Sequence, residues 1–192
     1  YSDLNQDITL IDNYLVGATK FYNTWQSVTM TGNTFYSMSP GNGTNFDPTQ
    51  FPDNLYLTTR PTGTQLFIRP NQYEQGRAHI VVYNWDLAST VNVDVSDLLN
   101  PGDEFEIRNG QNYFAPPVVS GTFDGGQVTL PMTGLEPAQP IGGGLIEPSE
   151  YTGPEFNVFV LVKTGGDPDT PTATPPATSP TYSSYLSPIA GD

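Results

Sequence analysis

Apolar and polar positions repeat at the start of the chain with an interval of 20 residues (27 − 7 = 20). Residues 7–15, DITLIDNYL, align with residues 27–35, SVTMTGNTF, so that three apolar positions coincide and Asn13 falls on Asn33. An interval near twenty in strand-like sequence is typical of one coil of a β-solenoid, in which like side chains stack in register. We therefore predict that residues 1–40 form parallel β-coils with hydrogen-bonded Asn13 and Asn33 amides. The alternative is a pair of ordinary strands that resemble each other by chance.

Residues 50–164 contain a series of short runs that predict strands. Some runs alternate strictly, such as TVNVDV (90–95), whereas FNVFVLVK (156–163) is apolar at nearly every position. Alternation is typical of a strand with one face in water, and a continuous apolar run is typical of a central strand covered on both faces. Helical periodicity is nearly absent, and Gly and Pro number 19 each. The pattern therefore predicts an all-β protein in which this segment forms an antiparallel β-sandwich.

Two finer predictions concern the sandwich. Residues 118–132 are expected to form two strands joined as a hairpin through Asp124-Gly125-Gly126, because this sequence favours a tight turn. The core is expected to contain apolar residues both from strands with an alternating pattern and from strands that are apolar throughout. These residues are Ile80, Val82, Val93, Phe105, Ile107, Val158 and Val160.

The last segment, residues 165–192, differs in composition from the rest. It begins as a linker rich in Pro and Thr, whose hydroxyl groups would accept O-linked sugars. Its end carries apolar side chains that a plain linker does not need, and we predict that they form a self-assembly arm: Tyr182, Tyr185, Leu186 and Ile189. About fifteen residues of extended Pro-rich chain would span roughly 45 Å, far enough to reach a neighbouring subunit.

Charge and composition exclude several classes of partner. The net charge is −14 with only six Lys and Arg residues, so neither nucleic acid nor an anionic membrane surface is a suitable partner. No apolar run approaches the roughly 20 residues that span a bilayer. Cysteine is absent, which removes disulfides and thiolate chemistry. Since neither an initiator Met nor a signal peptide is present, we expect a processed product or a fragment.

Candidate catalytic groups are few. His79 is the single histidine and lies inside a predicted strand, without a nucleophile motif such as G-x-S-x-G, so a structural role is preferred. Acidic residues occur mainly at outward strand positions and in turns: Asp86, Asp94, Asp97, Asp103, Glu104, Glu106 and Asp124. Two of them at the right separation would suit glycoside hydrolysis, but outward charges usually keep a sheet face solvated. No cofactor is predicted; Ca²⁺ would best suit loops such as NPGDE, although Asp and Gly are also ordinary turn residues.

Aromatic side chains offer one candidate for ligand binding. Tyr113 and Phe114 lie in the loop NGQNYFAPP and are the best candidates for a platform on which sugar rings stack. Packing against the protein itself is the alternative for both side chains.

The segments ITLIDNYL and SVTMTGNTFYS, together with the run from RAHIVVYNWD to FNVFVLV, resemble a known arrangement. They are similar to the C-terminal part of a secreted bacterial right-handed parallel β-helix protein with an appended β-sandwich. The resemblance implies an extracellular or cell-surface location. We expect a non-catalytic structural protein that assembles head-to-tail with other copies of itself into a filament or surface layer. The alternatives are the ancillary end of a larger secreted polysaccharide lyase or glycoside hydrolase, and a carbohydrate-binding module.

Overall fold

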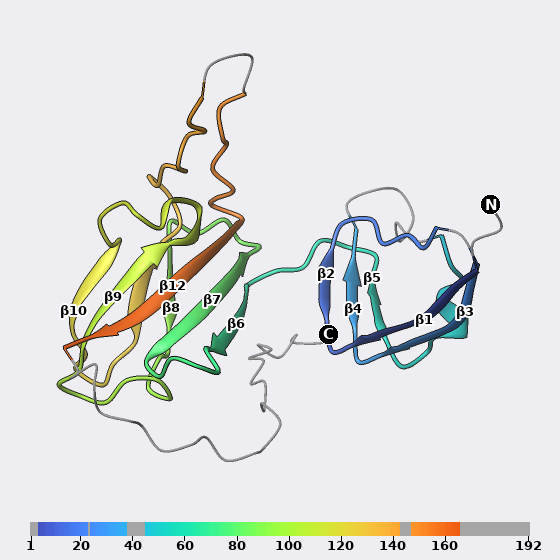
Figure 1. The fold of residues 1–192 in the computed structure, drawn as a ribbon, viewed down its shortest axis with the longest axis horizontal. Helices are drawn as coiled ribbons and strands as arrows, with labels where there is room; N and C mark the ends of the chain where they lie inside the picture. The colour runs from blue at the N-terminus through green and yellow to red at the C-terminus, as the bar shows by residue number, and fades with distance from the viewer. Residues whose placement is uncertain (1–3, 23, 38–44, 143–146, 166–192) are drawn as a thin grey trace. The chain divides into compact units, whose positions relative to one another are not determined.

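The computed structural model describes residues 4–22, 24–37, 45–142 and 147–165. The protein is all-β with antiparallel sheets, as predicted, and the described residues contain only two short 3-10 helices (Figure 1). The chain divides into two compact units, Tyr1–Pro61 and Thr62–Asp192. Neither short helix in the described segments has the length and hydrophobicity that a membrane span would require.

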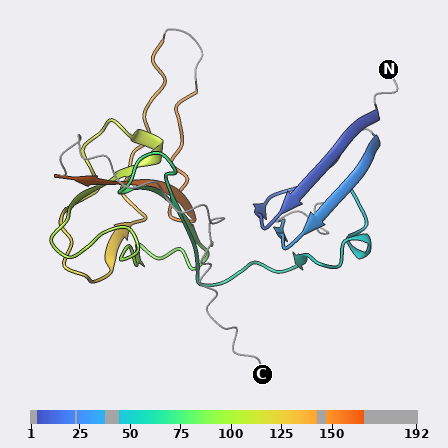
Figure 2. The ribbon, with the colours of Figure 1, turned by 60° about the horizontal axis from the view of Figure 1, so that its bottom comes forward.

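Parallel strands make up the first unit. β1 (Leu4–Ile11) pairs with β3 (Thr24–Thr31), while β4 (Thr34–Tyr36) pairs with both β2 (Tyr14–Val16) and β5 (Leu55–Leu57). β1 and β3 run side by side in both ribbon views (Figures 1 and 2). Ile8 lies opposite Val28 and Leu15 lies opposite Phe35, so the 20-residue alignment of the sequence is confirmed as the strand register.

The parallel pairing extends further along the chain than the sequence predicts. Residues 55–60 are expected at the start of the second domain, but β5 pairs in parallel with β4 and belongs to the first unit. The preceding Asn54 follows Asn33 at an interval of 21 residues. The extra residue hides this repeat in an alignment, and the segment before it contains the 3-10 helix η1 (Pro48–Gln50) where a strand would be expected. The division between the units therefore lies at Pro61, beyond the expected residues 40–50.

The second unit contains two antiparallel sheets. The larger sheet has the order β10 (Val119–Thr122), β9 (Glu104–Asn109), β12 (Phe156–Thr164), β7 (Arg77–Asn84) and β6 (Thr64–Pro70). The smaller sheet consists of β8 (Thr90–Val93) and β11 (Val128–Pro131). The five-stranded sheet faces the viewer in Figure 1, with β8 behind it.

Both sheets of the second unit contribute to one hydrophobic core. Alternation along β8 buries Val91 and Val93 and leaves Asn92 exposed, because successive side chains of a strand point to opposite faces. The buried cluster draws on β7, β8, β9, β11 and β12 and on the loops between them: Ile80, Val82, Val91, Val93, Val95, Leu99, Phe105, Ile107, Phe123, Val128, Leu130, Met132, Phe159 and Leu161. Five of the seven predicted core residues belong to it.

The two remaining predicted core residues lie on β12 and face the other way. Phe159 and Leu161 are fully buried in the cluster, whereas Val158 is only partly buried and Val160 is buried outside the cluster. Because β12 is apolar at nearly every position, its pattern does not reveal which face meets the core. The register does, since Phe159 lies opposite Ile80 and paired residues share a face.

The predicted hairpin at Asp124-Gly125-Gly126 is wrong. β10 pairs with β9 and β11 pairs with β8, so the two strands lie in different sheets. The turn itself forms, because the backbone N–H of Gly126 donates to Asp124 Oδ1 at 2.8 Å and Gly125 has a φ of 94°. It carries the chain from one sheet to the other, a path that lets Val128 and Leu130 enter the shared core.

Candidate functional site

Three asparagines form a hydrogen-bonded column at the corners of the first unit, which we call the asparagine ladder. Asn13 Nδ2 donates to Asn33 Oδ1 at 2.9 Å, and Asn33 Nδ2 donates to Asn54 Oδ1 at 2.8 Å. The backbone N–H groups of Asn13 and Asn33 donate to the same two oxygens, at 2.9 and 3.0 Å. The predicted contact between Asn13 and Asn33 is therefore confirmed. The column has a direction, because the amide oxygens of Asn33 and Asn54 each accept two bonds from the preceding asparagine.

Asn54 is a rung that the sequence comparison missed. The signal for it is the dipeptide Asp53-Asn54, which repeats Asp12-Asn13 and is close to Gly32-Asn33. The residue before each of the first two asparagines turns the chain through a positive φ, 53° at Asp12 and 67° at Gly32. A Cβ atom at Gly32 would meet the carboxylate of Asp12 stacked on it, and the φ of 67° lies in the left-handed region, so both features favour glycine at this corner.

Asn13 and the β2 residues after it form the first rung of the ladder, and they are more exposed to solvent than Asn33 and the β4 residues of the second rung. Val16 is 40% exposed, whereas its partner Tyr36 is 5% exposed. Asn13 and Leu15 are likewise partly exposed, whereas Asn33 and Phe35 are buried, with the Phe35 ring stacked on Tyr56 at 5.1 Å. Among the described residues β1 pairs only with β3, and β2 only with β4. β1 and β2 therefore present one free edge, which we call the N-terminal edge.

The predicted self-assembly arm lies outside the described residues. Tyr182, Tyr185, Leu186 and Ile189 all fall within residues 166–192. The arm remains a prediction from the sequence.

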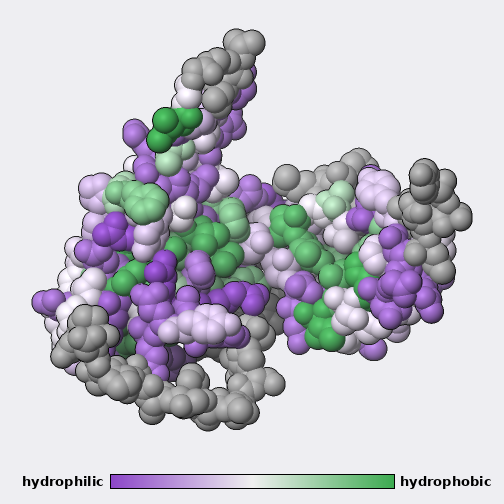
Figure 3. Space-filling model, in the orientation of Figure 1, coloured by the Kyte–Doolittle hydropathy of each residue, from purple (hydrophilic) through white to green (hydrophobic). Residues whose placement is uncertain are grey.

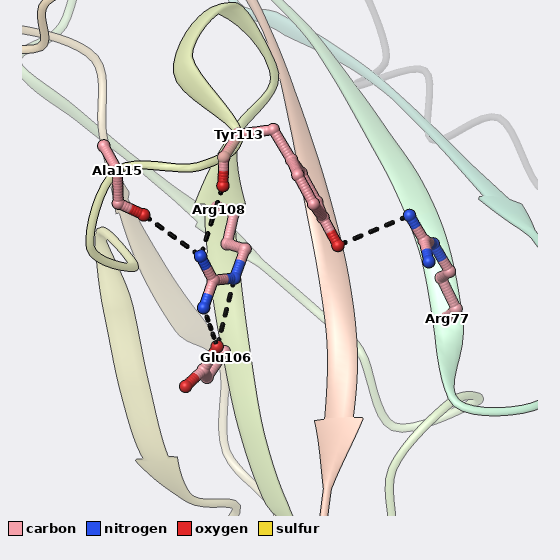
Figure 4. A network of polar contacts seen from close by, with 5 residues as sticks. All are labelled: Arg77, Glu106, Arg108, Tyr113 and Ala115. Carbon is pink, nitrogen blue, oxygen red and sulfur yellow. Dashed lines mark hydrogen bonds and ion pairs between the residues drawn. The ribbon is translucent and has the colours of Figure 1, made fainter.

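The predicted sugar platform lies in a loop whose backbone is fixed by Arg108. This loop follows the 3-10 helix η2 (Gly110–Asn112) at the end of β9. Arg108 Nη1 donates to the carbonyl oxygens of Tyr113 and Ala115, at 3.2 and 3.0 Å (Figure 4). Its Nη2 forms an ion pair with Glu106 at 2.6 Å, which holds the guanidinium in place. The backbone on both sides of Phe114 is thus held by one side chain.

Tyr113 and Phe114 have different surroundings. Arg108 and Arg77 flank the Tyr113 side chain, each with its guanidinium carbon 5.6 Å from the ring centroid (Figure 4). Arg77 Nη2 also donates to the Tyr113 hydroxyl at 3.4 Å. The Tyr113 ring is therefore packed between two cations of its own chain. Phe114 is 95% exposed and lies edge-to-face against Tyr113, so it alone of the pair presents an open ring.

Several of the carboxylates considered for catalysis make structural contacts. Asp94 accepts a bond from the backbone N–H of Ser96 at 2.9 Å, which lowers the pKa of the carboxyl group. Lys163 approaches Asp103 to 2.8 Å, and this hydrogen bond is the main cause of the lowered pKa of Asp103. A lowered pKa keeps a carboxylate ionised, whereas a general acid needs a raised one. In the part of the chain that the structure describes, no three His, Cys, Asp or Glu residues are grouped as ligands for a metal ion.

The comparisons with known proteins leave the geometry as the basis for assigning a function. No family model matches the sequence, and no match was found among curated proteins or solved structures.

Proposed function

We propose that this chain is a non-catalytic structural protein that assembles with other copies of itself through its N-terminal edge. In this proposal the first unit is the end of a right-handed parallel β-helix and the second unit is a β-sandwich. The single observation that carries it is the asparagine ladder, which accompanies parallel strands paired in register and leaves its first asparagine partly exposed. A stack of coils is stabilised by neighbours on both sides, so its exposed end favours the addition of another strand.

The chemistry of the first rung supports addition at this edge. The amide oxygens of Asn33 and Asn54 each accept two hydrogen bonds from the preceding rung. Asn13 Oδ1 occupies the equivalent position, and the described residues provide no donor for it. An added strand would pair with β1 and supply donors to this oxygen.

The occupant we propose is the C-terminal arm of a second copy. Its apolar residues, Tyr182 to Ile189, would pack over the exposed side chains of the first coil, such as Ile11 and Val16. The Pro- and Thr-rich linker before the arm would cross the gap between copies. Contacts that run from the end of one copy to the start of the next build filaments where the rotation between copies does not close into a ring, and we propose the open arrangement. An extracellular location, with O-linked sugars on the linker, completes the proposal.

A matched pair of substitutions tests the edge. Ile11→Lys places a charge on strand β1, where charged residues prevent edge pairing. Leu87→Lys in the second unit is the control, because Leu87 and Ile11 are both 51% exposed. Negative-stain microscopy of the purified chain should show filaments for the unsubstituted protein and for Leu87→Lys, and monomers for Ile11→Lys. Filaments that persist in Ile11→Lys, or an absence of filaments from the unsubstituted protein, would refute the proposal.

A second experiment separates the arm from the edge. Deletion of residues 181–192 should abolish filaments and leave the thermal unfolding of the remaining chain unchanged. If filaments survive this deletion but not Ile11→Lys, the edge is used and the arm is not its occupant.

The second candidate function is the ancillary end of a larger secreted polysaccharide lyase or glycoside hydrolase. The same exposed first rung favours it, since further coils of such an enzyme would cover the N-terminal edge equally well. Under this alternative the purified chain remains monomeric. It binds to an immobilised polypeptide that carries additional coils.

A further inference from the structure

One face of the five-stranded sheet carries half of the Lys and Arg residues of the chain and its single histidine. Across the sheet, Arg69 on β6 pairs with His79 on β7, which pairs with Val160 on β12, which in turn pairs with Arg108 on β9. Residues paired in this way point to the same face. Arg77 is two positions from His79 on β7 and therefore shares that face. The face is the outer one, because Ile80, which alternates with His79, is buried in the core.

This arrangement stands out against the charge of the whole chain. The net charge is −14, and the chain has six Lys and Arg residues and one His. Three of the arginines and the single histidine lie on this one face, which we call the arginine face. Glu106 and Glu74 pair with Arg108 and Arg77, and Glu104 shares the face two positions before Glu106, so three glutamates offset the charge of the three arginines. The arginine face is nevertheless far less negative than the rest of the molecule, so it is the region where an anionic ligand meets least repulsion.

Aromatic surface adjoins the arginines. Phe114 is 95% exposed next to Tyr113, and Arg108 fixes the loop by binding the carbonyls on both sides of Phe114. An exposed ring on a fixed loop stacks on a flat partner with little loss of conformational entropy. Figure 3 shows hydrophobic side chains over this sheet next to hydrophilic ones. Among the outward residues, Val81 and Val158 are apolar and partly exposed.

We propose that the arginine face binds an acidic polysaccharide. One sugar ring stacks on Phe114, and carboxylates along the polymer pair with Arg69 and His79, with Arg77 at the border of the same face. The row from Arg69 to Arg108 crosses three strand spacings, or about 14 Å, which suits a polymer with regularly spaced charges. Guanidinium groups favour carboxylates because two N–H groups meet the two oxygens. Sugar stacking and carboxylate pairing together select a chain of uronic acids.

Nucleic acid fits this face less well. Duplex DNA carries one charge per about 1.7 Å of its axis, and binding it requires many cations to neutralise successive phosphates. The arginine face offers four basic side chains, two of them already paired with glutamates, on a chain of net charge −14.

Affinity electrophoresis in gels that contain polygalacturonate tests the proposal on the full chain. Phe114→Ala should weaken binding about tenfold through loss of stacking, and Arg69→Gln should weaken it by a similar factor. Tyr22→Ala is the control, because Tyr22 is an exposed aromatic residue of the first unit, at 71% exposure. The control should bind like the unsubstituted protein, and thermal unfolding of each variant shows whether it is folded.

The outcomes separate the alternatives. Retardation by polygalacturonate but not by neutral dextran, lost in Phe114→Ala and retained in Tyr22→Ala, supports the proposal. No retardation, equal retardation by dextran, or equal retardation by single-stranded DNA of matched charge overturns it. The test does not involve the N-terminal edge, so it stands independently of self-assembly.

Discussion

Replacing Asn33 by leucine should destabilise the first unit more than any other single change in the asparagine ladder. Asn33 is 1% exposed and uses both ends of its amide. Its Oδ1 accepts from the Asn13 backbone N–H and side chain, and its Nδ2 donates to the Leu10 carbonyl at 2.8 Å and to Asn54. The Asn33 backbone N–H still donates to Asn54 Oδ1 after the substitution, so that oxygen keeps one bond.

The magnitude follows from the groups left without partners. The Asn13 N–H and the Leu10 carbonyl each lose a bond in a partly buried site, at about 1–3 kcal/mol apiece. Some access of water to the first rung lowers the sum, so we expect a loss of about 2–4 kcal/mol in the free energy of opening. That loss corresponds to roughly 30-fold to several-hundred-fold faster amide exchange in this unit.

Hydrogen-exchange mass spectrometry of the full chain provides the assay. Peptides that cover residues 24–37 report the effect, and peptides from β7 and β12 of the second unit serve as an internal reference. Asn13→Leu is the matched control, since it removes the same amide from the partly exposed rung and should accelerate exchange less than tenfold. Equal effects of the two substitutions, or an acceleration below threefold in Asn33→Leu, would show that the ladder does not stabilise the stack.

Two further predictions concern the second unit. Phe159→Ala should lower its stability by about 3–5 kcal/mol, because Phe159 is fully buried, whereas Val158→Ala on the opposite face should cost less than half as much; urea unfolding followed by Trp85 fluorescence checks both. Lys163 lowers the pKa of Asp103 below its ordinary value of 3.8, so the stability that this pair contributes is present above about pH 4 and is lost as the pH falls through the lower folded-state pKa. Lys163→Met should therefore reduce the acid-side loss of stability in urea titrations between about pH 5 and pH 2, and an unchanged slope would contradict the assignment.

The strand register of the first unit could be predicted because the repeat marks it at several positions at once. Apolar residues and an asparagine coincide at a constant interval, and stacking in register is the simplest way to satisfy all of them. The third asparagine, Asn54, is not predicted by the repeat. Its interval to Asn33 is 21 residues, and η1 interrupts the strand pattern before it. The dipeptide Asp53-Asn54, which repeats Asp12-Asn13, is the sequence signal that indicates Asn54 as a member of the ladder.

In the second unit the sequence predicts strands better than their partners. β12 is apolar on both faces, so the choice between Val158 and Phe159 as the core residue depends on its pairing with β7. The turn at Asp124 forms as its sequence predicts, but a turn signal is local and does not say whether the flanking strands share a sheet. The sequence does not single out Arg77 and Arg108, because their approach to Tyr113 depends on pairing between distant strands.

The corners of the first unit also determine how its length can change in evolution. Removing the 20 residues from Asn13 to Gly32 would join Asp12 to Asn33 and recreate an Asp-Asn corner like Asp53-Asn54. Insertions and deletions of one whole repeat therefore preserve every corner, whereas the loss of one residue within β3 would exchange the two faces of that strand. Unequal recombination between repeats would lengthen or shorten such a protein in steps of about one repeat and keep a corner asparagine in each.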